Sequence, residues 1–219
     1  MWKKVVLLAG VFVCAFLASG SDVRTTVSVL PEDKELYSAL KLSGQIGYTA
    51  FHQAMEGYRR IPGRKKEVLT IIDYSKPSDR KRLFVLDLKK RELVYASYVA
   101  HGRNSGNRYA TSFSNVNGSY KSSLGFYKTE NTYRGKNGYS LVLDGLEKGI
   151  NDHAKERAIV IHGADYADPA VLKSTGRLGR SLGCPALPRE VNREIIDYIK
   201  EGSLLYIYAV TGDQPQPNS

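Results

Sequence analysis

The stretch that most restricts the fold of this chain is residues 159–163, where three aliphatic residues are followed by His162 and Gly163. A short β-branched run of this kind is typical of a buried strand. After a polar loop, residues 179–184 bring Cys184 out of a turn that contains two glycines. A strand that ends in an imidazole, beside a loop that carries a thiol, can form a Cys–His pair in which the thiolate attacks a substrate.

The glycine before the cysteine supports the same interpretation. Gly183 has no side chain, so the backbone there can approach a substrate carbonyl closely. The amides of Gly183 and Cys184 are then candidates for an oxyanion hole, which stabilises the negative charge that develops on that carbonyl.

The first twenty residues have the layout of a secretory signal peptide: a basic start, an apolar run over residues 5–18, and small residues at 18–20. The run is short for a membrane span, although an uncleaved anchor is the alternative. A lipid-modified Cys14 is disfavoured because Val13 stands where a small residue is expected. Cleavage of this peptide would leave Cys184 as the single cysteine of the mature chain. It would also remove the apolar run, so no stable membrane span is expected. Such a lone thiol is either a reactive group or an inert buried one.

The excess of positive charge indicates what kind of partner the protein can bind. The formal net charge is +10, from 32 Lys and Arg against 22 Asp and Glu. A basic exported protein attracts anionic material such as a cell wall or a membrane surface. The sequence has no nucleic-acid-binding motif, so no nucleic acid partner is expected. We therefore expect a periplasmic or cell-wall-associated protein.

Periodicity divides the chain into helical and extended parts. Residues 31–63 form a predicted helical segment, with Asp33 as a candidate cap and His52 as a structural or surface residue. In its second helix the predicted apolar face comprises Ile46, Ala50, Phe51, Ala54, Met55 and Tyr58. Strands are predicted at 68–73, 83–88, 93–100, 125–129, 140–143, 159–162 and 203–210, with a helix from Pro188 that Gly202 stops.

These elements predict a mainly β (α+β) fold, a β-sandwich or barrel-like catalytic domain over residues 66–211 with peripheral helices. The Gly-, Ser- and Asn-rich segment 101–123 contains no clear element, and a polar loop of this length is typical of a functional region. Residues 212–219 are predicted to be a disordered tail.

The histidine-glycine strand and the Ser181-Leu182-Gly183-Cys184 turn resemble the L,D-transpeptidase catalytic domain of the YkuD type. Further blocks carry the resemblance, which covers residues 67–210; they are 100–102, 105–106, 113–115, 122–125, 138–141, 157–163 and 179–187. The resemblance implies a mainly β cysteine acyl-transferase that acts on peptidoglycan stem peptides. It implies Cys184 as nucleophile, His162 as general base and the Gly163 carbonyl as the group that orients the imidazole. Ser181 and Gly183 match the small residues of the motif.

The chain departs from the family pattern after the cysteine. Ala186 and Arg189 stand where many members have an arginine and an asparagine. Arg180 or Arg177 would then have to bind a substrate carboxylate, and the alternative for each is an exposed loop arginine. His101 either lines the donor pocket or is a strand-end histidine whose ring bonds to backbone.

No metal or cofactor is expected, because the spacing of the histidines and Cys184 matches no compact ligand motif, and His153 is predicted at the surface. Three functions remain open. The first is an L,D-transpeptidase, which joins a tetrapeptide donor to an amine acceptor and forms a cross-link. The second is an L,D-carboxypeptidase, in which water is the acceptor. The third is a non-catalytic cell-wall-binding module with an unreactive thiol. A papain-like protease is disfavoured, because there the nucleophile precedes its histidine in the chain.

Overall fold

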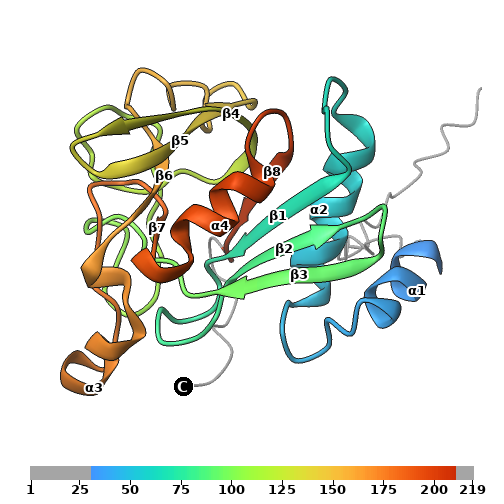
Figure 1. Cartoon of the computed structure of the whole chain (residues 1–219), viewed down its shortest axis with the longest axis horizontal. Helices are drawn as coiled ribbons and strands as arrows, with labels where there is room; N and C mark the ends of the chain where they lie inside the picture. Colours follow the sequence, from blue (N-terminus) through green and yellow to red (C-terminus); the bar gives the residue numbers. More distant parts are fainter. Residues whose placement is uncertain (1–30, 211–219) are drawn as a thin grey trace, which may run out of the picture.

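The computed structural model describes residues 31–210, so the predicted signal peptide 1–20 and the predicted tail 212–219 lie outside the described part (Figure 1). The helices are α1 (Pro31–Ala39), α2 (Tyr48–Arg60), α3 (Leu172–Thr175) and α4 (Arg189–Ile199), with 3-10 turns η1 (Asp165–Ala167) and η2 (Pro169–Val171). The strands are β1 (Val68–Asp73), β2 (Leu83–Asp87), β3 (Glu92–Ser97), β4 (Gly125–Gly135), β5 (Gly138–Gly145), β6 (Val160–Gly163), β7 (Ala186–Leu187) and β8 (Leu204–Tyr208).

The described strands form one mixed sheet in the order β3-β2-β1-β8-β4-β5-β6-β7. Strands β1, β2 and β3 form an antiparallel meander. Two pairs are parallel: β1 with β8, and β6 with β7. The last strand of the described residues, β8, therefore joins the meander to β4 and the rest of the sheet.

Strand β1 is buried on both faces, which explains its unbroken apolar sequence. Leu69 and Ile71 contact one core cluster with helix α2 (blue-green in Figure 1). Val68 and Ile72 face the opposite side, where helix α4 and residues of β4, β5 and β6 share a second cluster. Because both ends of the sheet contribute to this second cluster, the sheet curls over it. The predicted mainly β, barrel-like fold with peripheral helices is confirmed.

Helix α2 presents the predicted apolar face: five of the six residues expected there lie on α2, Ile46 lies just before its first residue, and all six are buried. The capping role predicted for Asp33 is wrong. Asp33 lies inside α1 and is fully buried, where it accepts a hydrogen bond from His52 Nδ1 at 2.6 Å and pairs with the Arg59 guanidinium. His52 is therefore a structural residue that ties α1 to α2. The predicted division between the helical segment 31–63 and the domain 66–211 stays a prediction, although α2 and the sheet share one core.

Within residues 31–210, no helix combines the length and the apolar character that a bilayer crossing needs.

Candidate active site

The sheet brings the two predicted catalytic residues to neighbouring positions. His162 lies on β6, and its Cα partner on the parallel strand β7 is Ala186. Cys184 precedes Ala186 by two residues, so the turn that carries it runs beside β6. The thiol Sγ lies 3.7 Å from the Ala158 carbonyl, just before that strand, to which it donates.

The thiol of Cys184 is half-buried and packs against the main core cluster. Burial raises its pKa above the ordinary value, while a backbone hydrogen bond at Val160 and the charge of Arg157 act in the opposite direction. The resting group is therefore a neutral thiol that needs a base.

The imidazole of His162, the predicted base, has a defined orientation. The side chain is buried, and its Nδ1 lies 3.2 Å from the Gly163 carbonyl. A carbonyl only accepts, so Nδ1 carries the proton and Nε2 keeps its lone pair. Burial also lowers the pKa of His162, which keeps the ring neutral. The orienting contact that the resemblance implied for Gly163 is thus present.

The raised pKa of Cys184 predicts an alkaline alkylation profile. Because the free thiol must lose its proton to react, the rate of modification by iodoacetamide should rise with pH through a midpoint above that of an unperturbed thiol. Peptide mapping of residue 184 measures this rate. In denaturant the midpoint should return to the ordinary value, and a folded-state midpoint below neutral pH would contradict the prediction.

Ser181 holds the turn together through its hydroxyl, and the substrate-binding role predicted for it stays a prediction. Its hydroxyl accepts from the Gly183 amide at 3.0 Å and donates to the Cys184 carbonyl at 2.6 Å. Gly183 has φ 131°, a conformation that glycine adopts without strain. Because the Gly183 amide already donates to Ser181 Oγ, the Cys184 amide is the better candidate of the two, and the oxyanion role stays a prediction for both.

The long loop 101–123 holds this turn in place. Ser122 Oγ donates to the Gly183 carbonyl and accepts from the Gly102 amide, both at 3.0 Å. Ser105 Oγ in turn accepts from the Ser122 amide at 2.8 Å. A Cβ at Gly102 would lie 2.6 Å from the Tyr120 carbonyl, so only glycine fits there. The loop therefore supports the turn that carries Cys184.

The prediction that His101 lines a donor pocket is wrong. Its side chain is fully buried, with Nδ1 2.8 Å from the Arg82 guanidinium and Nε2 3.4 Å from the Gly106 carbonyl. An arginine only donates, so Nδ1 accepts and Nε2 carries the proton. Burial, followed by the charge of Arg82, lowers the pKa of His101 to about 3. His101 is therefore a neutral structural residue.

The arginines are arranged differently from the sequence prediction. Arg180 Nη1 donates to the carbonyls of Arg103 at 3.2 Å and Gly106 at 3.1 Å. Arg177 Nη1 donates to the Leu178 carbonyl at 2.8 Å. Both side chains are half-buried, and substrate binding by either stays a prediction. Arg189 forms an ion pair with Asp165.

Arg157 is the residue that sequence reasoning missed. Its guanidinium donates to the carbonyls of Ser114 at 2.7 Å and Lys121 at 2.6 Å, and to Ser123 Oγ at 3.1 Å. A Cβ built on Gly183 would lie 3.5 Å from Arg157 Nη2, so this cation adjoins the nucleophile turn. The sequence signal for this role was the position of Arg157 just before the predicted strand 159–162. However, it ends the charged run 155–157, which is equally typical of a solvent-exposed surface.

Across the described part of the chain, no group of three or more His, Cys, Asp and Glu side chains is arranged to hold a metal ion.

Comparison with known proteins places the chain in a family. The model of the L,D-transpeptidase catalytic domain matches residues 42–208, and the chain belongs to that family. Solved structures similar to the chain include an L,D-transpeptidase from Mycobacterium smegmatis, with 13% identity and a TM-score of 0.40 over 65% of this chain and 59% of that one. L,D-transpeptidase 1 from Mycobacterium tuberculosis has 11% identity and a TM-score of 0.37 over 65% and 62%.

The helical cell shape determining protein Pgp2 from Campylobacter jejuni has 12% identity and a TM-score of 0.41 over 67% of this chain and 49% of its own. The chain thus spans less than two thirds of the length of these structures. A search of curated proteins found no match.

Proposed function

We propose that this protein is a cysteine-dependent L,D-transpeptidase that acts on the stem peptides of peptidoglycan. The observation that carries the proposal is the place of Cys184 beside β6: its thiol contacts the Ala158 carbonyl just before that strand, and Ala186, two residues after it, pairs with His162, whose Nε2 carries no proton. Membership of the family supports the same reaction class. The predicted signal peptide supports a periplasmic or cell-wall location.

The reaction has two halves. In the first, His162 Nε2 takes the thiol proton, and Cys184 Sγ attacks the carbonyl carbon of the third residue of a tetrapeptide stem. The Cys184 amide donates to the resulting oxyanion. The bond to the terminal D-alanine then breaks, the proton on His162 passes to the leaving amine, and a thioester remains.

In the second half, an amine of a neighbouring stem attacks the thioester. His162 accepts the proton of that amine and returns it to the departing sulfur, so the enzyme is regenerated and a cross-link forms. Arg157 stays beside the turn throughout and holds residues 114–123 against it. If water replaces the amine, the product is a trimmed stem, which is the carboxypeptidase outcome.

The test is the mass of the protein after incubation with a defined tetrapeptide muropeptide. We expect an adduct on Cys184 equal to the donor minus one D-alanine, and its loss with formation of a cross-link when an acceptor amine is added. His153→Ala is a suitable control because that side chain is exposed. Absence of both adduct and released D-alanine would contradict the proposal and favour a non-catalytic cell-wall-binding module.

A further inference from the structure

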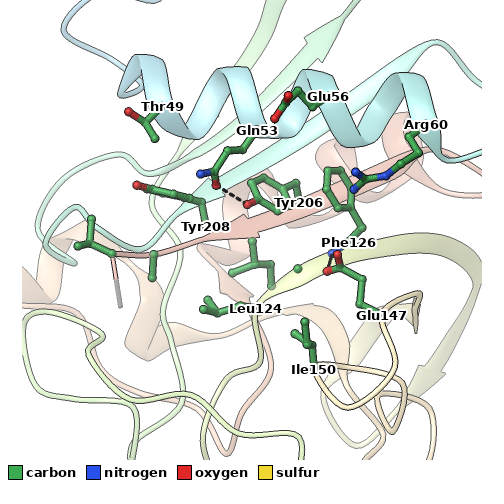
Figure 2. Close-up of a pocket in the computed structure, with 14 residues that line it drawn as sticks. Thr49, Gln53, Glu56, Arg60, Leu124, Phe126, Glu147, Ile150, Tyr206 and Tyr208 are labelled. Carbon is green, nitrogen blue, oxygen red and sulfur yellow. Dashed lines mark hydrogen bonds between the residues drawn. The ribbon is translucent and has the colours of Figure 1, made fainter. Parts of the chain in front are cut away.

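A second cleft lies between helix α2 and the β4–β8 region of the sheet, with a volume of about 990 Å³ (Figure 2). Neither Cys184 nor His162 lines it. Its walls come from four parts of the chain: one face of α2, the start of β4, the segment that follows β5, and the end of β8. None of these residues takes part in the reaction derived above.

The helix wall is polar. Thr49, Gln53, Glu56 and Arg60 recur at helical spacing along one side of α2 and line the cleft. The apolar residues of α2 face the core instead, so this row is its solvent side. The wall offers hydroxyl, amide, carboxylate and guanidinium groups, which together supply both donors and acceptors.

The opposite side is aromatic and held in place. Tyr206 and Tyr208 lie two residues apart on β8 and therefore point to the same face of the sheet. Tyr206 stacks on Phe126 with ring centroids 4.3 Å apart, and its hydroxyl donates to Gln53 Oε1 at 2.9 Å. That bond fixes Gln53 and leaves its amide protons for a ligand.

A carboxylate completes the cleft. Glu147 Oε2 accepts from the Phe126 amide at 2.8 Å, which leaves the second oxygen as an acceptor for a ligand. Gly125 has φ +90°, and a Cβ there would collide with Glu147 Oε2. This position therefore requires glycine, and the glycine makes room for the carboxylate.

Charge and shape select the ligand. Two carboxylates and one guanidinium line the cleft, so its formal charge is −1 in a chain of net charge +10, which disfavours an anionic ligand. A sugar ring presents a flat C–H face to aromatic rings and hydroxyl or acetamido groups at its edge to mixed donors and acceptors. We infer that the cleft binds an uncharged glycan of N-acetylated sugars.

The cleft adjoins the candidate active site at one end. Leu124 lines the cleft and also packs against the cluster that Cys184 contacts. Ser122, two residues earlier, bonds to the Gly183 carbonyl. Two residues span at most about 7 Å. Since the inference rests on the proposed function, the glycan is the strand that carries the donor stem, lying along α2 while its peptide reaches the thiol.

The experiment is a calorimetric titration of the full chain with the tetramer of N-acetylglucosamine, which carries no peptide. We expect saturable binding, weakened about fivefold or more by Tyr208→Ala and by Gln53→Ala. Tyr133→Ala is the matched control, because Tyr133 is 43% exposed and does not line the cleft. Thermal unfolding of each variant separates loss of binding from loss of fold.

Cys184→Ala should bind the tetramer with wild-type affinity. The glycan-binding inference and the proposed acylation are therefore tested separately, and either can be contradicted without the other. Absence of saturable binding by the wild-type chain would overturn the inference, even if the thioester forms. If Tyr208→Ala weakens the binding of a free tetrapeptide as much as that of the glycan tetramer, the cleft binds peptide instead. Binding only after removal of residues 211–219 would reassign it to that segment of the chain, and either result overturns the inference.

Discussion

Replacement of Cys184 by alanine is expected to abolish acyl-enzyme formation, and His162→Gln to slow it by about 10²–10⁴-fold. Alanine removes the only atom that forms the thioester. Glutamine keeps the approximate size of the imidazole but has no group that accepts the thiol proton at neutral pH. Because the resting thiol is neutral, the loss of its base has a direct effect on the rate.

Single-turnover labelling with the tetrapeptide donor, followed by mass spectrometry, measures both effects. Cys184 is half-buried and its hydrogen bond to Ala158 is long at 3.7 Å, so Cys184→Ala should unfold close to the wild-type urea midpoint. His162→Gln that retains more than about a tenth of the wild-type rate would show that another group acts as base.

Arg82→Met is expected to cost about 3–5 kcal/mol of the free energy of unfolding. Arg82 is fully buried, and its guanidinium donates to the Val99 carbonyl at 3.0 and 2.8 Å, to the Lys76 carbonyl at 3.1 Å, and to His101 Nδ1 at 2.8 Å. Methionine fills much of the volume but leaves these acceptors without a donor. Lysine should not restore stability, because it lacks the planar fork.

The same cluster makes stability depend on pH. The pKa of His101 is about 3 in the folded chain and near 6.5 when unfolded, so between these values the unfolded chain binds the extra proton. The contribution of neutral His101 to the free energy of unfolding is fully present above pH 6.5 and is lost as the pH falls toward 3. It amounts to at most roughly 5 kcal/mol.

Urea unfolding at pH 7.5 and pH 4 measures both effects. His101→Gln should flatten the pH dependence of unfolding, whereas His153→Ala should not. A loss below about 1 kcal/mol for Arg82→Met, or an unchanged slope for His101→Gln, would contradict this account.

The buried arginine marks the limit of sequence reasoning. Arg82 stands in the run Asp79-Arg80-Lys81-Arg82, which has the composition of a solvated turn. Its burial depends on carbonyls at Lys76 and Val99 that only the folded chain brings together. The same holds for His101, whose partner is this arginine, and for Arg157. Local patterns do not report partners that are distant in sequence.

Elements with a clear period were predicted well. The strands β1 and β2 and the helices α2 and α4 follow from their apolar spacing. The turns η1 and η2 and the short helix α3 were missed inside the polar loop, because three or four residues carry no detectable period. Strand β4 is longer than predicted because its register with β5 shifts between Thr129 and Thr132, which breaks the alternation.

The position of β8 has a consequence for synthesis. This strand lies between β1 and β4, yet it is made after every other strand of the described residues. A ribosome-bound chain that ends before residue 204 therefore has two part-sheets without the strand that pairs with both of them. Because the pairing of β1 with β8 joins residues that lie far apart in the sequence, it forms slowly, and the sheet stays open until residues 204–208 have been made.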